Sequence, residues 1–259
     1  MKVLLALLAL TASAQDLYLM PERFVVSPGE RIKVGIHSGK GFPESETCPD
    51  VELLEDPSMY AGALAYNMTS LRAEDRSAAV SVTIKGAGSP VLTIRTKPQV
   101  LELEPKKFEQ HLRDEGLDTL FSGPSQNGGA AKAAKMRRRH YAKAVLLAER
   151  PDETYKRRTG QILEFVPQRD PYSLKPGETL PVELLFRGKP EEGVRVERSR
   201  STAEGTDSVV LGRTNAKGLV EVPIDRAGKW RLRAIVMERS SEPGIDWETF
   251  LSSLTFEIQ

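Results

Sequence analysis

Apolar and polar residues alternate in two segments of this chain that echo each other. The segments are FVVSPGERIKVGI at 24–36 and YSLKPGETLPVELL at 172–185, and each carries a Pro-Gly-Glu sequence near its middle. Alternation with period two places the apolar side chains on one face of a strand. The Pro-Gly pair fits a type II turn, because proline presets φ at the second position and glycine accepts positive φ at the third. Each segment therefore predicts strand, turn, strand, and the echo predicts two β-sandwich domains in tandem.

The first half of the chain contains further short β-prone runs. They lie at 51–54, 61–71, 78–84 and 91–96, separated by Pro, Gly, Asp and Ser. Several short strands with turn signals between them and no helices are typical of an antiparallel sandwich. The sequence thus predicts an N-terminal β-sandwich over residues 15–104.

The second half shows the same organisation. Apolar runs lie at 142–148 and 162–166, and a tight turn at 214–218 separates two further strands. In 228–236 the apolar residues Trp230, Leu232, Ala234 and Val236 alternate with polar ones, and 254–258 alternates again as a final strand. A second antiparallel β-sandwich is predicted over residues 141–259. The expected fold class is mainly β, with two tandem antiparallel β-sandwich domains, Ig-like or prealbumin-like, joined by a short helical segment.

Helix is predicted only between the two sandwiches, in a connector over 105–140. Pro105 suits a first helical turn, Phe108 and Leu112 lie one turn apart, and Gly116 is placed to end the helix in the left-handed conformation. A second helix is predicted at 130–140.

A basic run marks that second predicted helix. It favours either a solvated helix end paired with the acidic Asp114, Glu115 and Glu149, or a surface for nucleic acid or an anionic membrane. The run has no interleaved aromatic residues, and this favours the solvated helix. The basic residues are Lys132, Lys135, Arg137, Arg138 and Arg139.

The N-terminus predicts export. Lys2 precedes an apolar run at 3–10, and Ala12-Ser13-Ala14 has the small-x-small form of a cleavage site, so residues 1–14 are expected to be a Sec-type signal peptide. The apolar run falls short of the ~18–20 residues of a transmembrane helix, and no cysteine follows it for lipid attachment. A periplasmic or secreted mature chain without membrane insertion is expected, the alternative being that this segment is a buried N-terminal strand.

Composition is consistent with a folded chain without electrostatic bias. The 259 residues are 39% hydrophobic and 28% charged, with 37 Lys and Arg against 36 Asp and Glu. This balance argues against a nucleic-acid partner, whose binding domains are net basic. Cys48 is the only cysteine, so no intramolecular disulfide forms, and its thiol is expected to be buried.

The residues that bind metals are scattered. The three histidines lie on different predicted elements without paired spacing, and His37 is out of phase with the apolar alternation around it, so all three are expected at the surface. No metal site and no cofactor are predicted. A divalent metal stays possible without support from His or Cys spacing, for example on carboxylates without calcium-loop spacing. The histidines are His37, His111 and His140, and the carboxylates are Asp207, Asp225 and Asp246.

Catalytic signatures are missing as well, so no catalytic residue is assigned. The sequence has no Gly-x-Ser-x-Gly, no phosphate-binding glycine loop and no His-Glu-x-x-His. Aromatic residues at loops or chain ends can stack on a sugar or a peptide, although Trp247 could equally pack as a lid on the second sandwich. The candidate ligand-binding residues are Asp16, Tyr18, Tyr141, Asp246 and Trp247.

Several segments carry a family resemblance. GKPEEGVRV and TNAKGLVEVPIDRAGKWRLRA resemble the carboxypeptidase-regulatory or prealbumin-like sandwich, while QDLYLMPERFVVSPGE, RRHYAKAVLL and DWETFLSSLTFEIQ resemble the bacterial exported family DUF4198. The resemblance implies an exported protein of a family once associated with periplasmic components of nickel uptake. Members often begin the mature chain with His-Asp, but this chain has Gln15-Asp16, which removes that metal ligand.

These observations lead to one functional expectation and two alternatives. An exported, non-enzymatic binding or interaction module is expected, whose partner is a small molecule, a glycan or an envelope protein. The family resemblance suggests instead an accessory periplasmic component of a nickel/cobalt-type uptake system. A hydrolase of unknown specificity is the third possibility.

Overall fold

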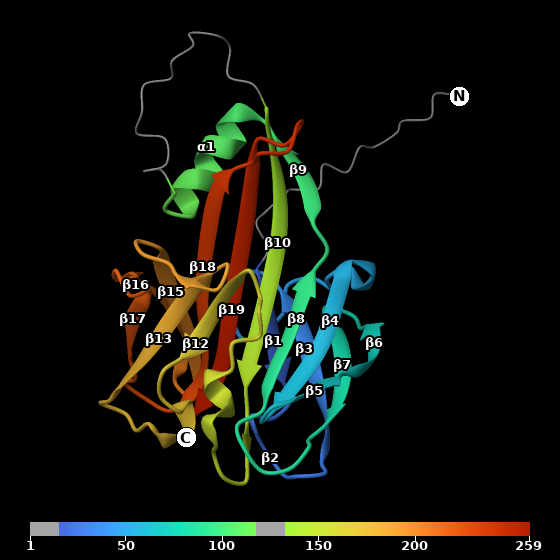
Figure 1. The fold of residues 1–259 in the computed structure, drawn as a ribbon, viewed down its shortest axis with the longest axis vertical. Helices are drawn as coiled ribbons and strands as arrows, with labels where there is room; N and C mark the ends of the chain where they lie inside the picture. The colour runs from blue at the N-terminus through green and yellow to red at the C-terminus, as the bar shows by residue number, and fades with distance from the viewer. Residues whose placement is uncertain (1–15, 118–132) are drawn as a thin grey trace.

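The structure, a computed structural model, describes residues 16–117 and 133–259 and is built mainly of β-strands (Figure 1). The predicted signal peptide at 1–14 and the first residues of the predicted second helix, 130–132, lie outside the described residues. Among the described residues, no helix has the length and apolar character needed to span a membrane. The short 3-10 helices are η1 (Val51–Leu53), η3 (Glu153–Lys156) and η4 (Pro171–Ser173).

A nine-stranded sheet forms the centre of the molecule and takes strands from both halves of the chain. Its strands follow the order β16-β15-β18-β19-β10-β8-β4-β5, with β9 also paired to β10. The strands are β16 (Gly205–Arg213), β15 (Arg195–Thr202), β18 (Gly228–Arg239), β19 (Trp247–Ile258), β10 (Ala134–Val145), β8 (Val91–Thr96), β4 (Leu54–Ala61), β5 (Leu64–Asn67) and β9 (Gln99–Leu103).

Two four-stranded sheets pack against this central sheet. The first, in the order β1-β3-β7-β6, comprises β1 (Leu17–Pro21), β3 (Arg31–Ser38), β7 (Ala78–Thr83) and β6 (Thr69–Ala73). The second comprises β12 (Leu163–Pro167), β13 (Thr179–Phe186), β14 (Lys189–Pro190) and β17 (Leu219–Pro223). A small parallel pair joins β2 (Val25–Val26) to β11 (Leu147–Ala148).

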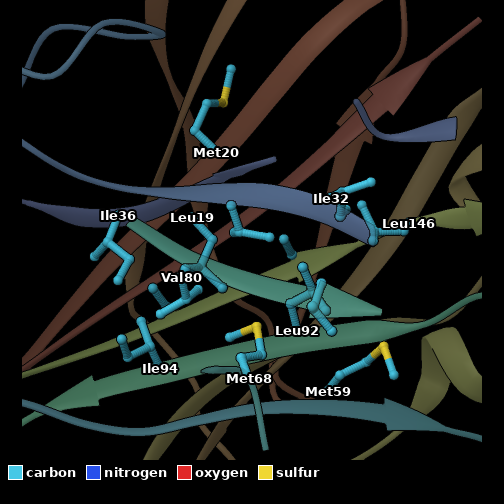
Figure 2. Packing of buried hydrophobic residues seen from close by; sticks show 14 of the residues in the cluster. Leu19, Met20, Ile32, Ile36, Met59, Met68, Val80, Leu92, Ile94 and Leu146 are labelled. Atoms are coloured by element: carbon cyan, nitrogen blue, oxygen red, sulfur yellow. The ribbon is translucent and has the colours of Figure 1, made fainter. Parts of the chain in front are cut away.

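The two hydrophobic cores lie on opposite faces of the central sheet, and β10 contributes to both. Ala142 and Ala144 belong to the core under the first sheet, whereas Tyr141 and Val145 belong to the core under the second. Successive residues of a strand point to opposite faces, which explains the division. Figure 2 shows the first core, where Leu19, Ile36, Val80, Leu92 and Ile94 pack together with Met59 and Met68.

The shared sheet confirms a mainly β sandwich fold and changes its organisation. The predicted boundary between residues 140 and 141 falls inside β10, so the two sandwiches share one sheet. The sheet is also not wholly antiparallel, because β10 runs parallel to β19. The prediction of purely antiparallel sheets was wrong, because β10 pairs with the last strand of the chain. The local sequence pattern does not reveal a partner so distant in sequence.

The predicted turns of the echo are present in both copies. Gly29 and Gly177 have φ of 82° and 97°, which a side chain would disfavour. The amide of Glu30 donates to Ser27 O (3.1 Å) and that of Glu178 to Lys175 O (3.1 Å), which closes each turn. The first strand of the second copy is replaced by η4, and Tyr172 at its centre contacts both cores.

The connector is helical only in its first part. Helix α1 (Pro105–Asp114) begins and packs as predicted, with Phe108 and Leu112 buried and Gly116 at φ 66°. It covers the upper end of the central sheet, beside β18 and β10 in Figure 1, through a third cluster that includes Trp247. The predicted helix at 130–140 was wrong, since β10 begins at Ala134. Pairing with β19, β8 and β9 overrides the helical propensity of this Ala-, Lys- and Arg-rich stretch.

Candidate functional site

The five candidate residues from the sequence do not converge on one site. Asp16 and Tyr18 are buried close together at the start of β1, while Tyr141 lies in the second core and Trp247 in the cluster under α1. Asp246 is exposed and accepts a hydrogen bond from the amide of Lys135 (2.8 Å). A single ligand site built from all five is therefore wrong, and only the Asp16–Tyr18 region remains as a pair.

Asp16 is part of a buried charge network. Its carboxylate pairs with Arg233 and lies 3.6 Å from Arg231 Nη1, and Arg233 also pairs with Glu115 (2.5 Å). Burial acts to lower the pKa of Arg233, but the carboxylates of Asp16 and Glu115 raise it above its usual value. Burial raises the pKa of Glu115, and Arg233 opposes that rise. These opposite charges neutralise one another, and their ion pairs connect the start of β1 to β18.

Tyr18 holds the loop at 39–47 over β1. Its hydroxyl oxygen lies 2.6 Å from Gly41 O and 2.8 Å from Glu44 O, so its proton is donated to this loop. The guanidinium carbon of Arg231 lies 4.8 Å from the centroid of the Tyr18 ring, and the same guanidinium donates a hydrogen bond to Lys40 O (3.1 Å). Burial raises the pKa of Tyr18, which therefore stays a neutral donor. The loop is thus fixed at several points.

His37 stands on the same face of the sheet as Tyr18 and is half-buried. Its Nδ1 lies 2.9 Å from Pro43 O, and a carbonyl oxygen only accepts, so Nδ1 carries the proton. Burial lowers the pKa of His37, which favours the neutral ring with a lone pair on Nε2. A Cβ on Gly35 would come within 2.6 Å of Nε2, so the ring lies directly over this glycine.

A pocket of about 230 Å³ opens beside this imidazole. It lies where β1, β3 and the loop at 39–47 meet the first residues of β18, so both halves of the chain contribute. Lys33 and Glu74 pair across it (3.3 Å), whereas Lys229 has no ion pair among the described residues. The remaining lining residues are Met20, Pro21, Glu22, Gly35, Pro43, Glu44 and Ser77. The pocket is small, polar and of mixed charge.

The histidines are less exposed than predicted. His140 is buried on β10 inside the central sheet, His37 is half-buried under the loop at 39–47, and His111 is half-buried on α1, which packs against the end of the central sheet. Within residues 16–117 and 133–259, no group of three or more His, Cys, Asp or Glu side chains is arranged to hold a metal ion.

Two of the candidate cation-binding carboxylates do meet, but at an arginine. Asp207 lies 2.9 Å from Arg200 Nε, and Asp225 pairs with the same guanidinium. Arg200 therefore occupies the place that a cation would need.

Cys48 is half-buried, less than predicted. Its thiol donates to Ser77 O (3.0 Å) and packs against the first core.

The basic run lies on a strand and finds other partners than predicted. Arg137 pairs with Glu248 and Glu242, and Lys135 lies 3.8 Å from Glu102. These acids sit on neighbouring strands or the turn beside them. The predicted partners near α1 were wrong because a strand presents these side chains across the sheet, not along a helix.

Sequence reasoning missed the pocket at His37 and the buried arginines beside Asp16 and Tyr18. Arg231 and Arg233 alternate with Trp230 and Leu232, which placed them on the other face of β18 and so suggested solvent exposure. The loop at 39–47 and Asp16 cover that face, although they lie 191 to 217 residues away in sequence from the arginines they contact. Two arginines inside an otherwise apolar strand were the only local signal.

Comparison with known proteins finds one family. A model described as "Domain of unknown function (DUF4198)" matches residues 12–238. Among solved structures, the D0-D1 domain of intimin matches with a TM-score of 0.24 and 11% identity, covering 92% of this chain and 96% of that one. Murine CEACAM1b matches with a TM-score of 0.23 and 9% identity, covering 94% and 100%. No curated protein matches the chain.

Proposed function

The chain belongs to the DUF4198 family, whose function is unknown, and we propose that it is an exported, non-enzymatic binding protein whose ligand occupies the pocket beside His37. One observation carries the proposal: the proton on Nδ1 is held by Pro43 O, which leaves Nε2 as a neutral acceptor against Gly35, and His37 and Gly35 both line the pocket. The pocket is smaller and more polar than the usual site for a drug-sized ligand, so a small polar ligand is the kind it could hold.

The lining chemistry favours a small ligand with a primary amine. Nε2 of His37 and the carboxylates of Glu22 and Glu44 all accept hydrogen bonds, which suits an ammonium group. Lys229 offers a positive charge for a carboxylate at the other end of the ligand. No aromatic ring other than the His37 imidazole lines the pocket, so a sugar would lack the large stacking surface it commonly uses. An amino acid or the end of a short peptide fits best.

The alternatives have no comparable support among the described residues. A nickel/cobalt-type uptake role needs a group of metal ligands, and a hydrolase needs a nucleophile positioned by a base. The pocket offers one imidazole whose Nδ1 is held by a backbone carbonyl, with no carboxylate orienting it. The exported location is carried over from the N-terminal sequence.

Calorimetric titration with glycine, ethanolamine, glycylglycine and Ni²⁺ tests the proposal. We expect saturable binding of at least one amine to the wild-type protein. His37→Ala should weaken it by about fivefold or more, since one lost hydrogen bond is worth about 1 kcal/mol. The matched control is His111→Ala, a half-buried histidine on α1, which should leave the affinity unchanged. Failure of all three amines to bind, or equal affinity in His37→Ala, would contradict the proposal, and binding of Ni²⁺ alone would favour the uptake role.

A further inference from the structure

Three polar side chains, Arg139, Tyr141 and Ser252, gather on the other face of the central sheet. Ser252 Oγ and Arg139 Nε are buried atoms that find no partner among the described residues, while the buried Tyr141 hydroxyl lies beside the Arg139 guanidinium and donates its own proton to no described acceptor. Tyr141 and Ser252 are register partners on β10 and β19, and Arg139 lies two residues before Tyr141 on β10. All three therefore point to the same face.

The two hydroxyls are deeply enclosed. Tyr141 is 1% exposed and Ser252 is 3% exposed, in the core that the second four-stranded sheet covers. A buried hydroxyl without a partner destabilises a fold, so native structures usually satisfy such groups with protein, water or a ligand. Two adjacent hydroxyls beside a guanidinium indicate a binding site for a polar ligand.

The positive charges around Tyr141 and Ser252 favour an anionic ligand. Arg139 has no carboxylate within ion-pair distance among the described residues, whereas Arg95 pairs with Asp56 (2.6 Å) and Arg187 with Glu238. Burial raises the pKa of Tyr141, and Arg139, through its charge and a side-chain hydrogen bond, opposes that rise together with the charges of Arg95 and Arg187. The phenol is therefore a neutral donor in a positive field.

A small hollow lies on the neighbouring strand β8. Arg95, the register partner of Tyr141 on β8, lines a hollow of about 80 Å³ together with Gln161 and Thr159. Gln161 donates from Nε2 to Ile94 O and Ala142 O (3.3 Å each), which closes the side of the hollow nearest β10. Arg139, Tyr141 and Ser252 do not line this hollow themselves and are next to it only through Arg95.

We propose that Arg139, Tyr141 and Ser252 form a second binding site, for a small oxyanion group such as a carboxylate or a phosphate. The guanidinium supplies the charge and its Nε–H, and the two hydroxyls donate to the oxygens of the anion. The site lies on the opposite face of the central sheet from the pocket at His37 and is independent of the amine-binding function. Its ligand is recognised by charge and hydrogen-bond donors, while the His37 pocket presents mainly acceptors.

Titration with phosphate, acetate and sulfate at constant ionic strength, with chloride as the reference anion, tests this site. We expect saturable binding of at least one oxyanion. Arg139→Gln should weaken it about 10- to 100-fold and Tyr141→Phe about fivefold, from the usual worth of charged and neutral hydrogen bonds. Arg226→Gln, which makes the same charge change at an exposed arginine, should leave the affinity unchanged.

Stability without an oxyanion provides the check on folding. Tyr141→Phe removes a buried hydroxyl whose proton has no acceptor among the described residues, so its melting temperature in chloride should equal or exceed that of the wild type. A stabilisation by phosphate that appears in the wild type and disappears in Tyr141→Phe supports the site. No saturable oxyanion binding, an effect that chloride reproduces, or an affinity unchanged by Arg139→Gln and Tyr141→Phe would overturn it, and none of these results bears on amine binding at His37.

Discussion

Lys143 and Glu164 form an ion pair that is almost completely buried, with side chains 1% and 2% exposed. Lys143 Nζ also donates to Phe165 O (2.8 Å), and Glu164 Oε1 accepts from the amide of Thr159 (2.6 Å). The pair joins β10 at the centre of the large sheet to β12 of the second sheet. Burial lowers the pKa of Lys143, and the carboxylate of Glu164 opposes this change.

Lys143→Met should lower the free energy of unfolding by about 3–5 kcal/mol, because it leaves the Glu164 carboxylate buried without its countercharge. Urea denaturation measures the change. Lys143→Met combined with Glu164→Leu should lose less than Lys143→Met alone, since no buried charge remains. The control, Lys156→Met, breaks the exposed pair with Glu153 and should stay close to wild type. A Lys143→Met protein as stable as this control would contradict the assignment.

Gly35→Ala should destabilise the protein by about 1–3 kcal/mol, as overpacking usually does. The added Cβ would lie 2.6 Å from His37 Nε2 and 3.1 Å from Met20 O. Removing the ring relieves the closer contact, so Gly35→Ala with His37→Ala should cost less than the sum of the two single changes. Chemical denaturation of the four proteins gives this coupling, and strictly additive values would show that the ring does not lie over Gly35.

His111 should make the protein less stable in acid. Burial lowers its pKa to about 4, and Arg138, Arg233 and Lys40 act in the same direction, while Asp114 opposes them. In the unfolded chain the pKa returns to about 6.5. Between these values the unfolded state binds the proton and the folded state does not, so stability is complete above about pH 6.5 and falls toward pH 4.

His111→Gln should remove this pH dependence while keeping a polar side chain on α1. Between pH 7 and pH 4 the wild type is expected to lose about 1–3 kcal/mol more than His111→Gln. Urea denaturation across this range measures both proteins, so the linkage of the other groups cancels in the difference. Parallel curves for the two proteins would show that His111 protonates as easily in the folded state.

Thr255→Val should loosen β1 from the central sheet. Thr255 Oγ1 donates to Leu19 O (2.7 Å), and Ser253 Oγ donates to Leu17 O (2.7 Å), so β19 holds the backbone of β1 through two hydroxyls. Valine keeps the shape and removes the donor, at a cost of about 1–3 kcal/mol for a buried acceptor left without it. Thermal denaturation measures the loss. Thr206→Val on the exposed edge strand β16 is the control, and equal effects would contradict the role of Thr255.

The candidate site was only partly accessible from the sequence. Asp16 and Tyr18 were selected and do lie together, but their partners Arg231 and Arg233 come from a strand more than 200 residues away. His37 was assigned to the surface because its alternation placed it away from the core. The predicted orientation of the His37 side chain was right, but the loop at 39–47 folds back over the same face of the sheet and half-buries the ring.

The sequence by itself determined the turns and the alternation of buried side chains in several strands of this chain. The alternation of Trp230, Leu232 and Ala234 placed these side chains in one core, and the turns at Gly29 and Gly177 formed as predicted, because period and φ preference act over a few residues. Tertiary structure decided the rest. Ala134–Val145 became a strand because the last segment of the chain, Trp247–Ile258, pairs with it in parallel. Such pairing joins residues about 110 positions apart, and it united the two sandwiches through one sheet and placed Tyr141 beside Ser252.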